Sequence, residues 1–404
     1  MHNWLLPEYI EDVLPRDAAR IESMRAAILE LFRVHGYELV MPPLMEYMAS
    51  LLSGTGRDME LQTFKVVDQL SGRLMGVRAD ITPQVARIDA HLLNRQGVTR
   101  LCYAGAVMHA LPSGPNSARE CLQVGAELYG DASVESDIEI QRLMLKALAT
   151  AGQPAVQLDL GHVAIFRALI EREGVAPELE AELFQALQGK DLPSLRAMTR
   201  GLDAATRRSL ECLPGLYGGG EVLAEARRCL PAYPEIGRAL DDLEAIHARL
   251  GSEVAGVGFD LADLRGYHYH TGVVFAAYAS AFPQAIALGG RYDEIGRAFG
   301  RARPATGFSM DLRQVARMAP FAERPAGILV PETAKAHLQG RQLDEAVDRL
   351  RAKGEVVVME LPGHRDTRGE LNCDRQLSFR GGEWVLDGLE PDAQGGDRSG
   401  RAGG

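Results

Sequence analysis

Two histidines stand two positions apart in the segment RGYHYHTG, residues 265–272. The segment has the pattern of a β-strand, which would direct the side chains of His268 and His270 to the same face. Such a pair can begin a metal site or form a catalytic pair. A metal needs a third ligand, however, and the sequence offers no local His-Glu or Cys cluster. We therefore predict no metal site, and the role of the two histidines stays open.

A second group of residues has the chemistry of a site for an amino acid. An arginine can bind a carboxylate through two parallel N–H donors, and acidic side chains can hold an ammonium group and an imidazole N–H. Gln and Thr can complete the polar shell. The alternative is that these are ordinary polar residues of loops that never meet. The group consists of Asp80, Thr82, Arg119, Gln123, Glu127, Arg265 and Tyr269.

A glycine-rich segment, GLYGGGEVLAEARR at residues 215–228, stands before a predicted helix and is a candidate phosphate site. It lacks the Gly-Lys-Ser/Thr ending of a phosphate-binding loop and has no clear strand before it. A loop between two helices is the simpler interpretation. The sequence also has no nucleophile elbow, so it gives a hydrolase no support.

The composition is that of an ordinary globular protein: 404 residues, 46% hydrophobic and 25% charged. The net charge of −11 disfavours nucleic acid, and we expect no tRNA partner. The five cysteines are dispersed and odd in number, which speaks against a disulfide framework. The longest apolar stretch, 273–282, is too short to span a bilayer, and acidic residues stand where a signal peptide needs basic ones. We expect a cytoplasmic protein without a cofactor or a membrane partner.

The elements that must position these residues are mixed. Apolar periodicity predicts helices at 16–35 and 309–318, and a mostly helical insertion at about 161–250. A small α/β unit should follow, with a hairpin at 375–388 that turns at two glycines. We predict an α+β fold with a core over 1–320, a C-terminal domain over 321–389 and a disordered tail over 390–404. The predicted core strands are 37–41, 74–78, 100–104, 121–130, 256–260, 267–278 and 284–290.

The order of these features resembles the class II aminoacyl-tRNA synthetases, and specifically the core of the histidine–tRNA ligases. HGYELVMPPLMEY, beginning at His35, is similar to motif 1, and residues 103–130 are similar to the motif 2 hairpin. Residues 289–317 resemble the Gly-Gly-Arg-Tyr-Asp segment that runs into motif 3. RGYHYHTG resembles the histidine-specific loop, which reads Arg-Gly-Leu-Asp-Tyr-Tyr-Thr-Gly in the ligases. The resemblance covers about 8–318 and implies an antiparallel sheet flanked by helices and a homodimer formed through motif 1.

The departures from the ligase pattern fall on the positions that bind ATP. In the ligases, motif 2 carries Phe-Arg-x-Glu, but this chain has His109 at the Arg position and Leu111 at the Glu position. Motif 3 of the ligases ends in an arginine, and Gln314 stands in its place. Each lost contact of an arginine is worth roughly 1.5–3 kcal/mol, so ATP affinity should fall on the order of a hundredfold. We expect neither amino-acid activation nor aminoacylation.

The positions that resemble the histidine pocket keep their chemistry, since Asp80 replaces a glutamate and the other six residues of the group match. His268 and His270 replace an aspartate and a tyrosine. This combination resembles the regulatory subunits of ATP phosphoribosyltransferase, a family paralogous to the ligases. The resemblance implies histidine as ligand, a short catalytic subunit as partner in a hetero-octamer, and feedback control of the first step of histidine biosynthesis. The alternatives are a ligase with degenerate ATP motifs, a free-standing histidine-binding module and a paralogue with an empty pocket.

Overall fold

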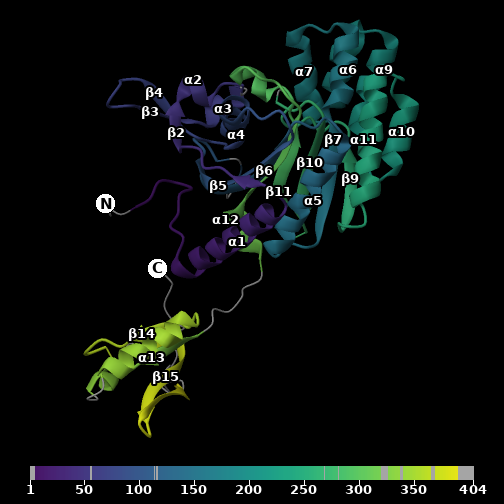
Figure 1. The fold of residues 1–404 in the computed structure, drawn as a ribbon. Coiled ribbons are helices and arrows are strands. Elements are labelled where there is room, and N and C mark those ends of the chain that lie inside the picture. Colours follow the sequence, from purple (N-terminus) through teal and green to yellow (C-terminus); the bar gives the residue numbers. More distant parts are fainter. Residues whose placement is uncertain are drawn as a thin grey trace, which may run out of the picture. The chain divides into compact units, whose positions relative to one another are not determined.

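The computed structural model describes residues 5–54, 57–112, 114, 117–267, 269–280, 282–319, 326–336, 340–364 and 369–389. The chain divides into two compact units, Met1–Pro320 and Phe321–Gly404 (Figure 1). The tail over 390–404, predicted to be disordered, and His268 both lie outside the described residues. No helix in the described part of the chain has the length and apolar character needed to cross a membrane.

The first unit is built on a sheet whose nine described strands follow the order β1-β5-β6-β12-β11-β10-β7-β9-β8. Neighbours from β5 to β7 are antiparallel, whereas β1 pairs with β5 and β7 with β9 in parallel. The antiparallel core predicted from the sequence is therefore confirmed. The strands are β1 (Glu38–Leu39), β5 (Thr99–Met108), β6 (Glu120–Tyr129), β7 (Val156–His162), β8 (Tyr217–Gly218), β9 (Gly256–Asp260), β10 (Val273–Ala279), β11 (Ala285–Arg291) and β12 (Ala305–Asp311).

Each face of this sheet buries its own apolar layer. Helices α1 (Pro15–Val34), α5 (Val134–Thr150) and α12 (Leu312–Met318) pack together on one face (Figure 1). The short helix α4 (Thr82–Arg87) covers part of the other. The apolar layer under α1, α5 and α12 is called the first layer, and the layer on the opposite face is called the second. Side chains alternate along β5, so Cys102 packs in the first layer and Tyr103 in the second. The second layer borders the candidate site.

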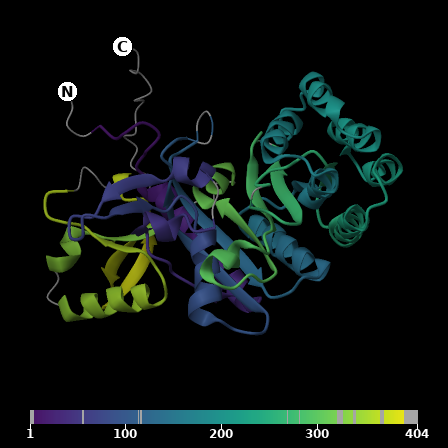
Figure 2. The same ribbon diagram turned by 90° about the horizontal axis from the view of Figure 1, so that it is seen from above.

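Between β7 and β9 the chain forms a helical insertion, whose helices gather beside the sheet (teal in Figure 2). Side chains start two of the helices, because Asp191 accepts the N–H of Ser194 and Asp203 accepts those of Ala205 and Thr206. Proline at the first helical turn starts two others. The helices are α6 (Val163–Glu173), α7 (Pro177–Gln188), α8 (Leu192–Met198), α9 (Ala204–Cys212), α10 (Glu221–Cys229) and α11 (Pro234–Leu250).

A small sheet of the order β2-β4-β3 is formed by the chain between β1 and β5, and of its members only β4 was predicted. It consists of β2 (Met45–Tyr47), β3 (Phe64–Val67) and β4 (Leu74–Val77), with helices α2 (Met48–Leu51) and α3 (Arg57–Gln62) between β2 and β3.

The second unit contains β13 (Gly327–Val330), α13 (Gly340–Ala352), β14 (Val357–Met359), β15 (Cys373–Arg380) and β16 (Glu383–Gly388). The predicted small α/β unit is confirmed, and so is its hairpin. Gly381 and Gly382 connect its strands with φ of 61° and 92°, the left-handed values that a tight hairpin turn requires.

Two predicted elements are present but begin later than expected. Residues 265–267 and 269–272 form turns, and β10 begins only at Val273. Gly266 has φ of 61°, and its carbonyl accepts the N–H groups of both Tyr269 and His270 at 2.7 Å. The described residues of this segment therefore do not have the period-two geometry of a strand. The helix predicted at 309–318 starts at Leu312, because 305–311 pairs with β6 and β11 as strand β12.

Candidate functional site

A cavity of about 420 Å³ lies at the sheet face that carries the second layer, and we call it the Glu127 cavity. Strands β6, β11 and β12, the loop from 265 to 272 and helix α7 contribute its walls. Among the described residues that line it, none is an arginine or a lysine. The cavity therefore suits the cationic or N–H-bearing part of a ligand.

Glu127 is the centre of this cavity and is only 1% exposed. Its carboxylate accepts hydrogen bonds from Thr82 Oγ1 at 2.9 Å, from Tyr103 OH at 3.0 Å and from Tyr292 OH. Burial raises the pKa of Glu127 to about 8, and the three hydroxyl donors only partly offset that effect. Gly307, which pairs with Glu127 on strand β12, provides space for the carboxylate, since a Cβ at position 307 would collide with it. The fold thus holds a carboxyl poised to ionise when a ligand donates to it.

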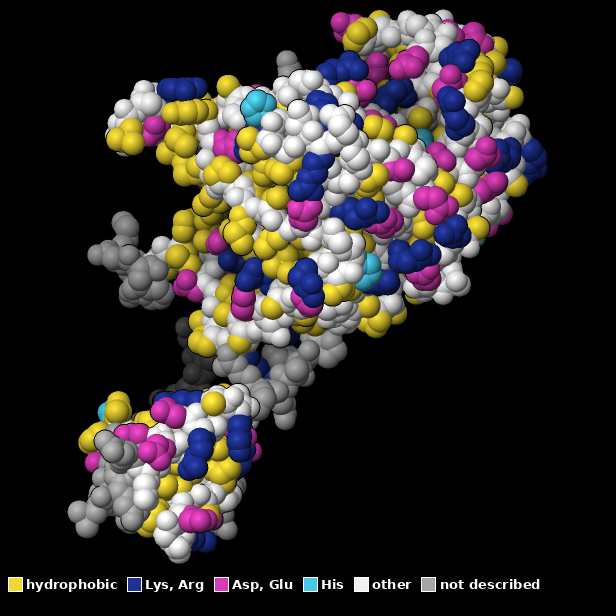
Figure 3. All heavy atoms as spheres, in the orientation of Figure 1, with side chains coloured by type: hydrophobic (Ala, Val, Ile, Leu, Met, Phe, Trp, Pro, Cys, Tyr) yellow, Lys and Arg dark blue, Asp and Glu magenta, His cyan; other side chains and the backbone are white. Residues whose placement is uncertain are grey.

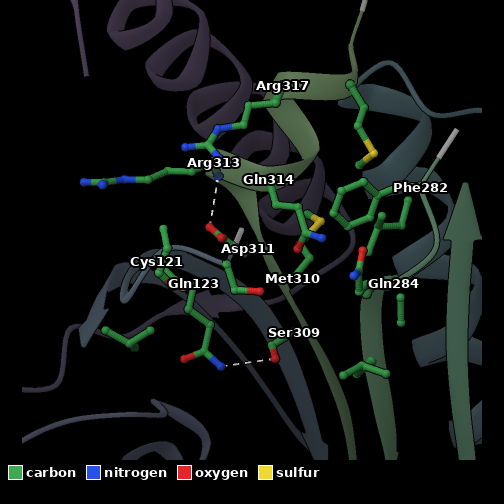
Figure 4. A pocket seen from close by; sticks show the side chains of 18 of the residues that line it. Cys121, Gln123, Phe282, Gln284, Ser309, Met310, Asp311, Arg313, Gln314 and Arg317 are labelled. Carbon is green, nitrogen blue, oxygen red and sulfur yellow. Dashed lines mark hydrogen bonds between the residues drawn. The ribbon is translucent and has the colours of Figure 1, made fainter. Parts of the chain in front are cut away.

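Asp80 lies at the rim, where Gln123 fixes its position. Its Oδ1 accepts from Gln123 Nε2 at 2.7 Å and from the N–H of Thr82 at 3.1 Å. Gln123 is itself held at both ends, because its Oε1 accepts from the N–H of Ile81 at 2.8 Å and its Nε2 also lies 3.1 Å from Ser309 Oγ (Figure 4). Gln123 therefore orients Asp80 instead of offering free atoms to a ligand.

Tyr269 supplies the unused hydrogen-bonding group of the cavity. Its ring lies 5.0 Å from that of Tyr292 and stands perpendicular to that of His270 at 5.2 Å. Its buried hydroxyl has no hydrogen-bond partner among the described residues. A buried hydroxyl without a partner is costly, so a ligand that pairs with it gains affinity.

His270 is a neutral wall of the Glu127 cavity. Burial lowers its pKa to about 4, and its Nδ1 lies 3.2 Å from the carbonyl oxygen of Arg265, to which it donates. The imidazole packs against Tyr269 and so fixes that ring. Its part is to shape the loop, and no second described histidine stands beside it.

A neighbouring cavity of about 590 Å³, which we call the Gln314 cavity, shares Leu288 and Ser309 with the first. Three arginines line it, and each is paired within the chain. Arg265 Nη2 lies 2.5 Å from Asp263 Oδ2, Arg313 Nη2 lies 3.1 Å from Glu120 Oε1, and Arg317 pairs with Glu11. The arginines of this cavity are therefore already neutralised by carboxylates of the same chain.

A further carboxyl, that of Asp311, lines the Gln314 cavity (Figure 4). Burial raises its pKa, although its Oδ1 accepts the N–H groups of Arg313 at 3.0 Å and Leu122 at 3.1 Å. A polyphosphate in this cavity would lie against Asp311 and against arginines that already have partners, which is unfavourable for an anion.

The three positions at which the ligase pattern is lost carry neither an arginine nor a glutamate here. His109 directs Nε2 to the carbonyl oxygen of Ala79 at 3.0 Å. Gln314 reaches into the cavity named after it (Figure 4), and Leu111 is 64% exposed.

The structure places six of the seven predicted binding residues in the two cavities. Asp80, Thr82, Glu127 and Tyr269 line the Glu127 cavity, and Gln123 and Arg265 line the Gln314 cavity.

Arg119 is not among the described residues that line either cavity. Its guanidinium stacks 4.7 Å over the ring of Phe64, and its Nε donates to the carbonyl of His109 at 3.1 Å. Arg119 stands at the hairpin end, where β6 begins and the strand period no longer sets its direction.

Sequence reasoning missed three contributors: Tyr103, Tyr292 and Ser309. Tyr292 belongs to the Gly-Gly-Arg-Tyr-Asp segment, whose motif had been noted without a role for its tyrosine. Tyr103 and Ser309 carry no local signal, since only the pairing of β5, β6 and β12 brings them to Glu127 and Gln123.

The other two candidate sites were the glycine-rich segment and the histidine pair of residues 265–272. The glycine-rich segment is occupied by its own carboxylate, because the N–H of Gly219 donates to Glu221 Oε1 at 2.9 Å. Within the described ranges, no three His, Cys, Asp or Glu side chains form a group that could hold a metal.

Two family models together match most of the chain. Residues 9–315 match the histidyl-tRNA synthetase family, and residues 325–387 match the C-terminal domain of the ATP phosphoribosyltransferase subunit HisZ. The chain is 59% identical over 386 residues to an ATP phosphoribosyltransferase regulatory subunit of Ralstonia nicotianae, covering 96% of this chain and 98% of the relative. It is 56% identical over 390 residues to one of Nitrosospira multiformis, with coverage of 96% and 98%.

Two solved structures share the fold of this chain. An ATP phosphoribosyltransferase regulatory subunit/histidyl-tRNA synthetase from Bacillus halodurans superposes with a TM-score of 0.79 at 27% identity, covering 92% of this chain and 97% of that one. A histidyl-tRNA synthetase from Nostoc sp. PCC 7120 has a TM-score of 0.75 at 16% identity, with coverage of 96% and 97%, and shows the fold alone. The predicted class II synthetase-like fold is confirmed. The chain belongs to the family of ATP phosphoribosyltransferase regulatory subunits, whose core is that of a histidyl-tRNA synthetase.

Proposed function

We propose that this chain binds histidine in the Glu127 cavity and acts, without catalysis of its own, as the regulatory partner of a short ATP phosphoribosyltransferase catalytic chain. In this role it is required for the partner's activity, and it brings histidine feedback to the first step of histidine biosynthesis. The relatives are named regulatory subunits, and a regulatory subunit needs a catalytic one.

The observation that carries the proposal is the pairing of Arg265, Arg313 and Arg317 with carboxylates in the Gln314 cavity. Amino-acid activation depends on cations that stabilise charge at the transferring phosphorus. Arginines that are already paired, beside a buried Asp311, are poorly placed for that task. The Glu127 cavity, in contrast, keeps an ionisable carboxyl and a free hydroxyl, the groups that an amino acid with an imidazole side chain can use.

Self-association fits the same proposal. Leu39, Met41 and Leu44, beside the edge strand β1, are 45%, 78% and 48% exposed. Figure 3 shows hydrophobic side chains gathered on the side of the first unit where β2, β3 and β4 lie. Exposed apolar surface of this kind favours a two-fold contact between copies of the chain. We propose this homodimer, through motif 1, as the unit that joins catalytic chains in a hetero-octamer.

The decisive experiment is co-purification with the candidate short catalytic chain, followed by phosphoribosyltransferase assays with and without this chain and with and without histidine. We expect activity only with both chains and inhibition by histidine only when this chain is present. Full activity of the catalytic chain alone would overturn the proposed role.

Histidine calorimetry on the chain alone tests the ligand. Tyr269→Phe removes the unpaired hydroxyl and should weaken binding severalfold without loss of stability. Tyr37→Phe is a matched control, because Tyr37 OH donates to Glu139 at 3.0 Å away from both cavities. Equal affinities of Tyr269→Phe and wild type would remove Tyr269 from the site, and no binding by the wild type would exclude histidine as ligand.

The match of residues 9–315 to the histidyl-tRNA synthetase family keeps a degenerate ligase as the second candidate. Histidine-dependent pyrophosphate exchange distinguishes the two, and we expect none. Exchange by the wild type would favour the ligase. A free-standing histidine-binding module would bind histidine without binding or activating any catalytic chain.

A further inference from the structure

The loop that closes the Glu127 cavity is attached to the helical insertion through Tyr267. The hydroxyl of Tyr267 donates to Glu180 Oε1 on α7 at 2.8 Å. Tyr267 is only 4% exposed, and its ring lies 5.2 Å from that of Phe166 on α6 and 5.6 Å from that of Phe184 on α7. Burial and the carboxylate of Glu180 hold the pKa of Tyr267 above its usual value, so the hydroxyl keeps the proton that it donates.

A second contact ties the backbone of the same loop to the insertion. Arg167 Nη2 on α6 donates to the carbonyl of Tyr267 at 3.2 Å and to that of His270 at 3.0 Å. The turn that carries Tyr269 is thus held between α6 and α7. Any shift of Tyr269 on ligand binding would therefore change the contacts that this loop makes with both helices.

Glu180, which accepts the hydrogen bond from Tyr267, lies on the face of α7 that also lines the Glu127 cavity. Glu180, Phe184 and Gln188 follow one another at intervals of four residues, which places them in one row along α7. Phe184 and Gln188 line the Glu127 cavity. One row of side chains therefore contacts the ligand space at one end and the tyrosine of the loop at the other.

We propose that the Tyr267–Glu180 hydrogen bond transmits the occupancy of the Glu127 cavity to the helical insertion, residues 163–250. This inference rests on the proposed function, since it assumes histidine as the ligand. A ligand between Tyr269 and the α7 row stabilises the arrangement in which the hydrogen bond is made. By linkage, the hydrogen bond strengthens ligand binding to the same extent. Tyr267 is then a positioning residue, and the insertion is the element that responds.

A double-mutant cycle tests the link through histidine affinity. Tyr267→Phe and Glu180→Ala should each weaken binding roughly tenfold, the worth of one hydrogen bond to a charged group. The double variant should bind no more weakly than either single one, because both remove the same interaction. Glu180→Gln keeps an acceptor oxygen but loses the charge, so its affinity should fall between those of the wild type and Glu180→Ala. Tyr37→Phe, which removes a comparable Tyr–Glu hydrogen bond, should leave affinity unchanged.

Hydrogen exchange supplies a readout that a purely structural role would not change. Helix α8 packs on α7 and α9 packs on α8, and neither contributes a described residue to the cavity lining. In the wild type, histidine should slow exchange in α8 and α9. At saturating histidine, Tyr267→Phe should lose that protection while α5 and the core sheet exchange as before.

The outcomes separate this inference from the function on which it rests. Histidine binding by the wild type together with unchanged affinity in Tyr267→Phe and Glu180→Ala would overturn the link alone. Additive losses in the double variant, or protection of α8 and α9 that survives in Tyr267→Phe, would also overturn it. No histidine binding by the wild type would overturn both the ligand and the link.

Discussion

Histidine binding should release a proton from the carboxyl of Glu127. Burial raises the pKa of this carboxyl to about 8 in the empty cavity, so it is mostly protonated near neutral pH. An ammonium or imidazole N–H donated by histidine stabilises the ionised form and lowers that pKa. The complex therefore binds fewer protons than the free chain and free ligand together. Histidine affinity should rise with pH until the pH exceeds the pKa that Glu127 has in the empty cavity.

The magnitude follows from that pKa. At about pH 7.5 a carboxyl with a pKa of about 8 is roughly three-quarters protonated, so binding should release about 0.7 proton. Between about pH 8 and pH 7 the affinity should fall about fivefold. This range lies above the usual pKa of the imidazole of free histidine, about 6.5, which limits the ligand's own contribution.

Calorimetry in buffers of low and high ionisation enthalpy, phosphate and Tris, measures the released proton directly. Glu127→Gln keeps the shape and a carbonyl acceptor but cannot ionise, so its binding enthalpy should not depend on the buffer. Glu139→Gln is the matched control. A hydrogen bond from Arg100 lowers the pKa of Glu139, which is therefore ionised with or without a ligand.

Two results would refute this reasoning. The first is a wild-type binding enthalpy that is the same in both buffers, which would mean that Glu127 does not change its protonation. The second is proton release that persists in Glu127→Gln, which would place the titrating group elsewhere. The other titratable groups facing Glu127 are Asp80, Tyr103, Tyr129, Tyr269 and Tyr292. Of these only Asp80 lacks a phenolic pKa, so Asp80→Asn would be the next variant.

Three other expectations concern stability and thiol chemistry. Gly307→Ala places a methyl group against the carboxylate of Glu127 and should lower the free energy of unfolding by about 1–3 kcal/mol in urea titrations, with loss of histidine binding. Asp137→Ala leaves Arg291, at 9% side-chain exposure, with Asp293 at 3.4 Å as a remaining carboxylate partner and should cost about 3 kcal/mol, whereas loss of the exposed Arg33–Glu30 pair should leave the free energy of unfolding nearly unchanged. The sulfurs of Cys212 and Cys229 lie 2.6 Å apart, so diamide, which takes up both thiol hydrogens, should reduce the titratable thiols of the unfolded chain from five to three. Five remaining thiols after treatment would show that the two sulfurs cannot join.

Elements whose signal is local were predicted well. Helix α1 was expected at 16–35 and occupies Pro15–Val34, and β9 has the predicted bounds, Gly256–Asp260. Strand β12 was mistaken for the start of a helix, because it is buried on both faces and shows no alternation. A short continuous apolar run cannot be assigned by period alone. The small sheet of β2, β3 and β4 depends on pairing between distant short segments, which a single sequence does not reveal.

The candidate site shows the same limit. Gln123 and Glu127 stand at even spacing on β6, and both point to the site side of that strand. Four residues along a strand nevertheless span about 13 Å, which is enough to put them in different cavities. Arg119 was assigned by motif position, but its direction is set at the end of the hairpin, where it stacks on Phe64 of another sheet. Chemical type and strand period therefore identify a site without deciding which member touches the ligand.

The proposed loss of nucleotide binding rests on more than the three substituted positions. An arginine at 314 would add one charge to the Gln314 cavity but leave Arg265, Arg313 and Arg317 with their carboxylates. Each of these partly exposed pairs is worth little by itself, so pairing energy alone does not exclude a nucleotide. A polyphosphate needs an excess of positive charge, but each of the three arginines that line this cavity is paired with a carboxylate, and Asp311 adds a further carboxyl. The proposed loss of nucleotide binding therefore follows from the charge balance of the Gln314 cavity, while the Glu127 cavity keeps the Tyr269 hydroxyl, which has no partner among the described residues.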